Sequence, residues 1–196
     1  RDQPRSRGLG DVYKRQTYGS FIHRQEERIL NRYLDKDQAH LNLDLACGTG
    51  RFLHFADYGM DISGEMLKIA QSKFPRAKLT LGSATDLAYK DSSFQHVFSV
   101  HLMMHFDLLQ LQQILAEVHR ITQANGYFIF DMPSEKRRKL TRYASSSWHG
   151  GNQITTNRLK AMVSDNWKLI AYHGVAFFPV HRIPKSLRKR LIALDN

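Results

Sequence analysis

The sequence contains a single cysteine, Cys47, among its 196 residues. One cysteine cannot form an internal disulfide, and it excludes zinc sites that are built from several cysteines. The chain also lacks an apolar run of bilayer-spanning length, a signal-peptide pattern at its start, internal repeats and low-complexity segments. These absences predict a globular protein in a reducing, cytoplasmic setting.

Acidic residues are scarce relative to basic ones, because 18 Asp and Glu stand against 29 Lys and Arg. The formal net charge of +11 permits an anionic partner such as nucleic acid or a membrane surface, although a solvated basic face accounts for it equally well. Residues 1–16 show no apolar periodicity, so we expect a non-native or disordered leader there. Residues 17–196 have the length of one domain with a substantial core.

An apolar strand that ends in a glycine turn is the most informative stretch of the chain. Leucines surround Asp44 over residues 41–45, and Gly48-Thr49-Gly50 follows closely. A helix is predicted to open over residues 51–55. Glycines let the backbone approach a ligand, and the N–H groups of a helix N-terminus can face a polar or charged ligand. The stretch therefore predicts a ligand-binding turn.

Two other nucleotide-binding turns fit this stretch less well. A dinucleotide-binding turn needs a small residue three positions after its second glycine, where this chain has Leu53. A P-loop needs a Gly-Lys-Ser/Thr ending, which is absent. The pattern Asp44-x-Ala46-x-Gly48-x-Gly50 instead resembles the first motif of the class I S-adenosylmethionine-dependent methyltransferases. An NAD-dependent oxidoreductase remains a third and less favoured alternative.

Features further along the chain extend this resemblance. Asp61 ends a predicted strand over 58–61, where it can accept hydrogen bonds from two ribose hydroxyls, with a helix cap as its alternative role. Ser63 is predicted to cap the helix that follows. Residues 82–94 resemble the family stretch beside the adenine, although Ser83 stands where the family has an acidic residue. Because serine is the weaker acceptor, we expect weaker adenine binding.

The remaining pattern predicts the elements that complete an open sheet. Further strands are predicted over 78–82, 96–101, 127–131 and 167–178, and further helices from Ser20 to Leu34, from Asp107 to Asn125-Gly126, and from Thr155 or Thr156 to Val163. No candidate follows for the family's seventh, antiparallel strand, so we expect a domain that is truncated at its C-terminus with an exposed sheet edge. The fold class is predicted as α/β, a Rossmann-like, mostly parallel open sheet with helices on both faces and without that last strand.

The resemblance implies S-adenosylmethionine as cofactor and S-adenosylhomocysteine as product, with in-line methyl transfer to a small molecule such as a lipid-like or quinone-like acceptor. The sulfonium already activates the methyl group, so the protein has to align the acceptor and exclude water. Asp44 and the glycine turn would hold the methionine end, Asp61 the ribose, and residues 83–85 the adenine. The cofactor-binding residues implied in this way are Asp44, Ala46, Cys47, Gly48, Gly50, Asp61, Ile62, Met66, Ser83, Ala84 and Thr85.

A general base is optional for this chemistry, and histidines are the candidates. His101 and His105 follow the fourth predicted strand, where an open α/β sheet binds its ligands, whereas His149 lies in a predicted loop. For each histidine, a packing or solvent-facing role is favoured over a catalytic one. No carboxylate stands among His101, Met104 and His105, and a hard cation such as magnesium prefers oxygen ligands, so we predict no metal.

A different function on the same fold stays open. The basic stretches 136–142 and 185–190 would contact phosphates in an RNA-binding methyltransferase or in a noncatalytic binding module. No aromatic platforms are interleaved with these basic residues, which disfavours that alternative. The basic amphipathic segment that starts at Pro184 is compatible both with contact to a membrane surface, which would suit a lipid-like acceptor, and with a solvated surface helix.

Overall fold

The computed structural model describes residues 17–133, 156–163 and 166–175. The chain divides into two compact units, one formed by residues 34–170 and the other by residues 1–33 together with 171–196. The predicted leader over residues 1–16 lies outside the described residues, so the division of the chain into a leader and a domain over 17–196 stays a prediction.

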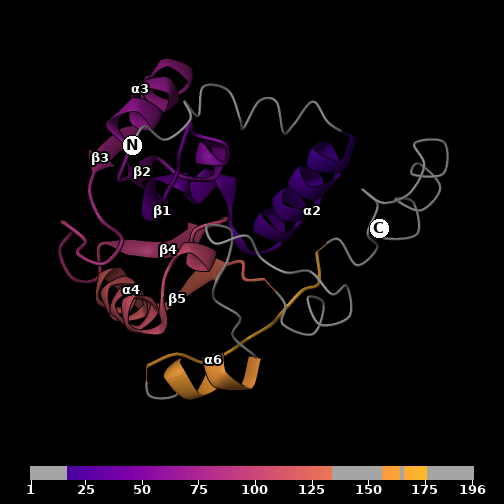
Figure 1. Cartoon of the computed structure of the whole chain (residues 1–196). Helices are drawn as coiled ribbons and strands as arrows, with labels where there is room; N and C mark the ends of the chain where they lie inside the picture. Colours follow the sequence, from indigo (N-terminus) through magenta and orange to yellow (C-terminus); the bar gives the residue numbers. More distant parts are fainter. Residues whose placement is uncertain (1–16, 134–155, 164–165, 176–196) are drawn as a thin grey trace, which may run out of the picture. The chain divides into compact units, whose positions relative to one another are not determined.

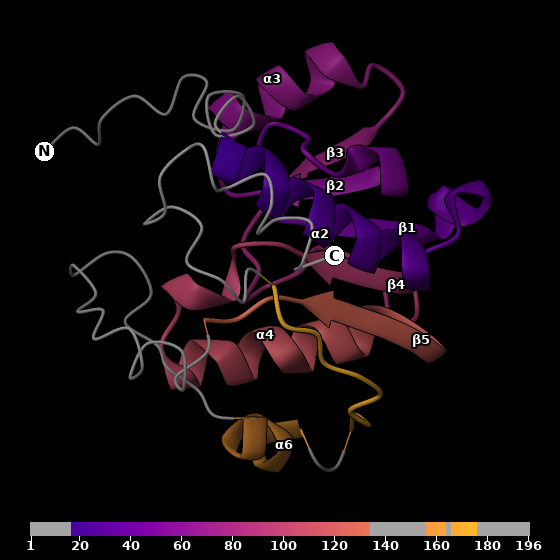
Figure 2. The same ribbon diagram turned by 90° about the vertical axis from the view of Figure 1, so that its right-hand side faces the viewer.

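A parallel sheet of five strands forms the centre of the unit over residues 34–170 (Figures 1 and 2). Its strands lie in the order β3-β2-β1-β4-β5, and each neighbouring pair runs parallel. They are β1 (Asn42–Leu45), β2 (Tyr58–Asp61), β3 (Lys78–Leu81), β4 (Phe94–Ser99) and β5 (Thr122–Phe130). The strand order reverses between β1 and β4, which is the point where open α/β sheets bind ligands. The predicted Rossmann-like open sheet is confirmed.

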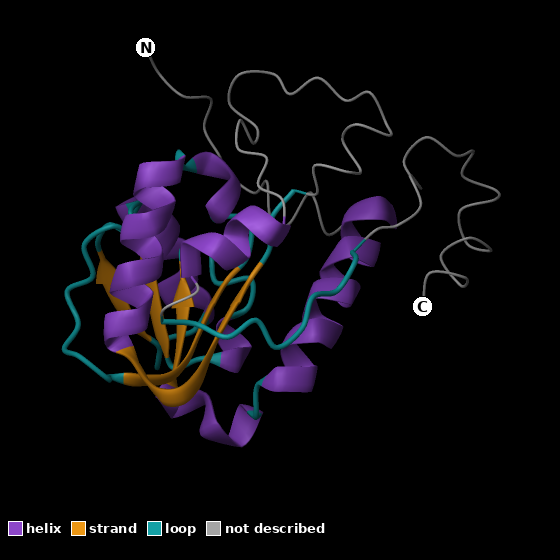
Figure 3. Ribbon diagram, turned by 90° about the horizontal axis from the view of Figure 1, so that it is seen from below, coloured by secondary structure: helices purple, strands orange, loops and turns teal. Residues whose placement is uncertain are grey.

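Helices cover both faces of this sheet, as Figure 3 shows for the purple helices around the orange strands. One face packs on α4 (Leu108–Ile121), and α6 (Thr156–Val163) adds partly buried side chains to the same core. The other face packs on α3 (Gly64–Lys73), with Leu67 and Ala70 buried. Short 3-10 helices complete the unit: η1 (Lys36–Leu41), η2 (Leu53–Phe55) and η3 (Met103–His105).

Both α3 and α4 begin where the sequence predicts. The hydroxyl of Ser63 accepts the N–H of Met66 at 3.4 Å and caps α3. At the start of α4, the Asp107 carboxylate accepts the N–H of Gln110 at 2.8 Å, and the Gln110 side chain accepts the N–H of Asp107 at 3.1 Å. The buried residues of α4 recur at helical spacing: Leu111, Ile114, Leu115, Val118 and Ile121.

The predicted helix after the glycine turn is wrong. Residues 53–55 form the single 3-10 turn η2, and the side chains of Leu53 and Phe55 are buried. The link between Gly50 and β2 is too short for a longer helix, because a crossover helix normally needs ten or more residues with its loops. No α-helix therefore forms between the glycine turn and β2.

The predicted end of α4 is also wrong, because the helix stops at Ile121 and not at Asn125-Gly126. The Thr122 hydroxyl donates to the carbonyl of Val118 at 2.6 Å, and Thr122 already has extended backbone angles. Strand β5 starts there, and a bulge opposite residues 94–96 accommodates Asn125, whose φ is +64°. The turn signal of Asn125 therefore marks a strand irregularity.

The sixth predicted strand does not form over the described residues 167–175. Ile170 and Tyr172 are 61% and 79% exposed, so the alternating apolar side chains there have no covering element among the described residues. Residues 176–178 of this prediction lie outside the described residues. A helix over 156–163 is confirmed as α6.

The other unit contains α2 (Thr17–Tyr33) and the described residues 171–175. Because α2 begins at Thr17, Ser20 lies within the helix, and its predicted role as the cap is wrong. The Tyr33 hydroxyl and Nε2 of His173 lie 2.7 Å apart, which joins two pieces that are distant in sequence.

Several predictions concern residues outside the described ranges. They are the basic stretches 136–142 and 185–190, the segment after Pro184, and His149. Within the described ranges, no helix combines the length and the apolar composition that a membrane span requires.

Candidate functional site

The carboxyl ends of the parallel strands meet at one edge of the sheet, and the predicted site residues follow them. The glycine turn over 46–50 follows β1, and Asp61 ends β2. Ser83 comes two residues after β3, and His101 comes two residues after β4. Because the strands are parallel, these four segments lie at the same edge.

Asp61 joins the glycine turn to the start of α3. Its carboxylate accepts the N–H of Gly48 at 2.8 Å through Oδ2 and the N–H of Ser63 at 2.8 Å through Oδ1. A carboxylate has about four lone-pair positions, so two remain for other donors. The alternative role of Asp61 as the helix cap is taken by Ser63, whereas its remaining acceptor capacity fits a pair of hydroxyl donors such as those of a ribose.

The glycine turn adopts the left-handed backbone at three of its residues. Ala46, Gly48 and Gly50 have φ values of +62°, +54° and +80°. A side chain added at Gly50 would meet Leu53 and Phe74 at 3.0 Å, whereas a Cβ at Gly48 would meet nothing within 4 Å. Gly48 therefore presents bare backbone to open space, which is the feature that lets a ligand approach closely.

Asp44 lies near the end of β1, and Cys47 lies within the turn. Asp44 is 3% exposed, and its burial, together with the nearby charge of Asp61, raises its pKa to about 8, against a smaller lowering by Arg51. Burial also raises the pKa of the Cys47 thiol above its ordinary value, so Cys47 stays protonated and is unsuited to nucleophilic chemistry. With a pKa of about 8, Asp44 is mostly protonated at neutral pH and lies close enough to Asp61 to be affected by its charge.

Exposed apolar side chains flank Asp61 on the sheet edge. Ile62 is 77% exposed and Leu81, the last residue of β3, is 64% exposed. Met66, one turn into α3, is half-buried. Large apolar side chains with this exposure next to a carboxylate fit a ligand that has both an apolar ring and hydroxyl groups.

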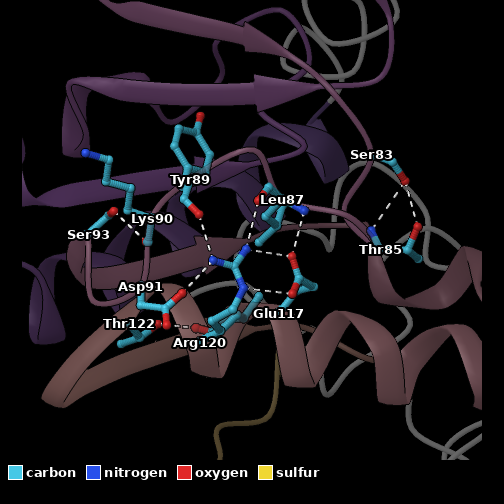
Figure 4. Close-up of polar contacts among 11 residues, drawn as sticks. Ser83, Thr85, Leu87, Tyr89, Lys90, Asp91, Ser93, Glu117, Arg120 and Thr122 are labelled. Atoms are coloured by element: carbon cyan, nitrogen blue, oxygen red, sulfur yellow. Dashed lines mark hydrogen bonds and ion pairs between the residues drawn. The ribbon is translucent and has the colours of Figure 1, made fainter.

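The predicted adenine-side segment forms a tight turn of its own (Figure 4). The Ser83 hydroxyl lies 2.8 Å from the Thr85 hydroxyl and accepts the N–H of Thr85 at 3.3 Å, while Ala84 is buried. The N–H of Gly82 donates to the carbonyl of Asp61 at 3.1 Å, so this turn adjoins the end of β2. Ser83 thus spends part of its hydrogen-bonding capacity within the turn.

His101 has a carboxylate partner that the sequence reasoning missed. Its N–H donates to Oδ1 of Asp131 at 2.6 Å, and its Nε2 lies 3.8 Å from Oδ2 of the same carboxylate. His101 adopts a φ of +66°, and both side chains are about one-third exposed, at 39% and 34%. The signal was present, because Asp131 directly follows an apolar strand just as Asp61 ends one.

The two candidate histidines therefore have different surroundings. His105 ends η3 and is exposed, whereas His101 is held by Asp131. The prediction of no metal rested on the lack of a carboxylate beside these histidines, and Asp131 shows that this premise is wrong. The prediction itself stays untested.

Part of the chain is similar to known methyltransferases. Residues 43–130 match the family described as methyltransferase domain. A malonyl-[acyl-carrier protein] O-methyltransferase of Hamiltonella defensa is 33% identical over 94 residues, which cover 45% of this chain and 36% of that protein. An uncharacterized protein of Methanocaldococcus jannaschii is 36% identical over 90 residues, covering 45% of this chain and 35% of that protein. The chain thus spans about a third of the length of these two relatives.

Solved structures agree with the fold. A protein of Pyrococcus horikoshii superposes with a TM-score of 0.56 at 27% identity, covering 71% of this chain and 66% of that chain. A structure described as a SAM-dependent methyltransferase of Methanosarcina mazei superposes with a TM-score of 0.58 at 20% identity, covering 70% of this chain and 82% of that chain. The glycine turn, Asp61 and the segment around Ser83 all lie within the matched residues 43–130.

Proposed function

We propose that the chain is a class I S-adenosylmethionine-dependent methyltransferase, which transfers the methyl group of S-adenosylmethionine to a small-molecule acceptor. The observation that carries the proposal is the position of the Asp61 carboxylate, which lies against the bare backbone of Gly48 and keeps acceptor capacity for two hydroxyls. When bound, the cofactor would supply a methyl group on a positively charged sulfur, and the neutral thioether that remains is a good leaving group.

The residues of the sheet edge suit the parts of this cofactor. We assign the ribose hydroxyls to Asp61 and the positively charged methionine end to Asp44 and the backbone of Ala46, Cys47, Gly48 and Gly50. Asp44 ionises as a cation approaches, because the added positive charge offsets its burial. The adenine is assigned to the apolar side chains of Ile62 and Met66 and to the polar groups of Ser83, Ala84 and Thr85.

His101 is our candidate general base, and Asp131 its positioning residue. A base at the end of β4 removes a proton from the acceptor as the acceptor attacks the methyl carbon. The carboxylate of Asp131 favours this transfer, because it stabilises the positive charge that His101 gains. His105 is the alternative base. It is exposed at the end of η3, whereas catalytic groups are commonly found in partly buried clefts.

The acceptor is proposed to be a small molecule that carries an oxygen nucleophile. The relative from Hamiltonella defensa is named for methyl transfer to oxygen on a malonyl group carried by a protein, which supports this chemistry without fixing the acceptor. A phenolic oxygen, which has to lose a proton as it attacks, matches a site whose base is a single histidine. Quinone-like and lipid-like acceptors belong to this class.

The proposal is tested by cofactor binding followed by product detection. We expect S-adenosylmethionine and S-adenosylhomocysteine to raise the melting temperature of the protein, because a ligand of the folded state stabilises it by mass action. Incubation with a metabolite extract and S-adenosylmethionine carrying a labelled methyl group should then give a product heavier by that group in mass spectrometry. NAD serves as the control ligand, and a shift with NAD alone would overturn the proposal.

A further inference from the structure

The loop from Gly82 to Ser93, between β3 and β4, is held by two side chains of α4 that none of the sequence patterns singled out. Glu117 and Arg120 lie one helical turn apart and both point toward this loop (Figure 4). The loop begins with the turn over residues 83–86, to which we assign the adenine. The contacts of the two side chains therefore bear on how that turn is placed.

Both the backbone N–H and the carbonyl of Leu87 form hydrogen bonds with side chains of α4. Oε2 of Glu117 accepts the N–H of Leu87 at 2.8 Å, and Nη2 of Arg120 donates to the carbonyl of Leu87 at 2.8 Å. Arg120 also donates through Nη1 to the carbonyl of Tyr89 at 2.7 Å. Leu87 is 3% exposed, and its carbonyl also accepts the N–H of Tyr89 at 2.7 Å. The buried N–H of Leu87 therefore depends on Glu117, whereas its carbonyl has two donors.

Glu117 and Arg120 also fix each other. Nε and Nη2 of Arg120 donate to Oε1 and Oε2 of Glu117 at 2.9 and 2.8 Å, which is the paired geometry that only arginine offers to a carboxylate. The Arg120 guanidinium accordingly holds the pKa of Glu117 below its ordinary value. Asp91 adds a third contact at 2.9 Å, but its side chain is 78% exposed and contributes little.

The turn over residues 83–86 directly precedes Leu87. The N–H of Asp86 donates to the carbonyl of Ser83 at 3.2 Å, and the hydroxyl of Ser83 is bonded within the same turn. Leu87 follows without an intervening residue. At the other end of the turn, the N–H of Gly82 donates to the carbonyl of Asp61 at 3.1 Å. A displacement of Leu87 therefore moves the turn relative to Asp61.

We propose that Glu117 and Arg120 are positioning residues for adenine recognition, which they control from α4 by fixing Leu87 and with it the turn over residues 83–86. The inference rests on the proposed function, because the turn is assigned to adenine only there. Neither side chain is placed against the cofactor. Their effect is on the geometry with which the polar groups of Ser83, Ala84 and Thr85 meet the base.

We call the contacts of Glu117 and Arg120 with the Leu87 backbone the clamp, and these contacts are tested first, without any nucleoside. Glu117→Gln removes the charge and Arg120→Lys keeps a positive charge but cannot make the paired contact. We expect both variants to exchange the Leu87 amide proton about tenfold faster in NMR hydrogen exchange, since a hydrogen bond to a charged group is lost or weakened. Asp91→Asn serves as the control, with unchanged exchange at Leu87. Unchanged exchange in both clamp variants would overturn the inference.

Adenine recognition is tested second, by calorimetric affinities for S-adenosylhomocysteine and S-inosylhomocysteine. Their bases differ in the amino or oxo group at position 6 and in N1, which is an acceptor in adenine and a donor in hypoxanthine. We expect the unmodified protein to prefer the adenine compound, and both clamp variants to lose about tenfold in its affinity and to discriminate less between the two bases. Ile114→Val, a fully buried substitution on α4, is the control that lowers stability and should keep the discrimination.

The outcomes separate the two proposals. Tight binding of S-adenosylhomocysteine with an unchanged ratio of the two affinities in both clamp variants would overturn this inference and leave the proposed function standing. A loss of discrimination in Ile114→Val equal to that in the clamp variants would also overturn it, because general destabilisation would then be the cause. If the unmodified protein binds neither nucleoside, the proposed function fails, and the inference fails with it.

Discussion

The carboxylate of Asp61 accepts the backbone N–H of Gly48 at 2.8 Å, which ties the end of β2 to the turn after β1. The second oxygen of the same carboxylate accepts the N–H of Ser63 at 2.8 Å. One side chain thus sets the spacing between the turn and α3. Only the 3-10 turn η2 lies between the glycine turn and β2, so the Gly48 N–H is oriented by the Asp61 carboxylate and not by a following α-helix.

Removal of the Asp61 carboxylate should weaken cofactor binding strongly. Asp61→Ala loses the charged acceptor that we assign to two ribose hydroxyls, and a hydrogen bond to a charged group contributes about 1.5–3 kcal/mol. We expect the dissociation constant for S-adenosylmethionine to rise by at least about tenfold in isothermal titration calorimetry. The matched control is Asp57→Ala, an exposed acid at the other end of the same strand. Equal affinities in Asp61→Ala and the unmodified protein would contradict the ribose assignment.

A side chain at Gly48 should block the approach of the cofactor. Gly48→Val places a branched side chain in the open space above the turn and strains a backbone with φ of +54°. The strain costs about 1–2 kcal/mol, and the blocked approach should abolish cofactor binding in addition. Asn125→Val is the matched control, because Asn125 has a similar φ of +64° in the β5 bulge. Retained affinity in Gly48→Val would show that the turn does not cradle the cofactor.

The starts of β2, α3 and α4 were predictable because local sequence determines them. Strand β2 spans residues 58–61 as predicted, and Ser63 and Asp107 cap α3 and α4 as predicted. Each of the two caps depends on a side chain that bonds to backbone three residues away. Such contacts depend little on the rest of the fold, so the sequence pattern identifies them.

Tertiary contacts decided the features that the sequence reasoning missed. The end of α4 moved to Ile121 because β5 pairs with β4 from Thr122 onward, which outweighs the turn preference of Asn125. Asp131 became the partner of His101 because β4 and β5 are neighbours, although thirty residues separate the two in sequence. The roles of Glu117 and Arg120 likewise depend on a loop that lies far away along the chain.

Asp44 should make stability depend on pH in an unusual direction. Its folded-state pKa is raised to about 8 from an ordinary 3.8, so the folded state holds a proton that the unfolded state releases above about pH 4. This contribution to stability is complete below pH 4 and is lost progressively as the pH rises to 8. Each unit of the shift corresponds to about 1.4 kcal/mol.

Asp44→Asn removes this titration. We expect the free energy of unfolding from urea denaturation to fall less between pH 5 and pH 8 in Asp44→Asn than in the unmodified protein, with a difference of at least about 1.4 kcal/mol. The control is Asp57→Asn, since Asp57 is exposed. The same pH dependence in Asp44→Asn and the unmodified protein would contradict the assignment of the raised pKa to Asp44.

His96 in β4 should make stability depend on pH in the opposite direction, so that stability falls as the pH is lowered. Its Nδ1 accepts the N–H of Tyr127 at 3.1 Å, and burial lowers its pKa below 6.5. The folded state thus favours the neutral ring, so this contribution is present above about pH 6.5 and is lost as the pH falls below it. A protonated Nδ1 cannot accept a hydrogen bond, so the Tyr127 amide proton should exchange faster at pH 5 in NMR hydrogen exchange. The free energy of unfolding of His96→Phe should be lower than that of the unmodified protein by about 1 kcal/mol at pH 7.5 but not at pH 5. His105→Gln, at an exposed histidine, should keep the pH dependence of the unmodified protein, and a protected Tyr127 amide at pH 5 would contradict the role of His96.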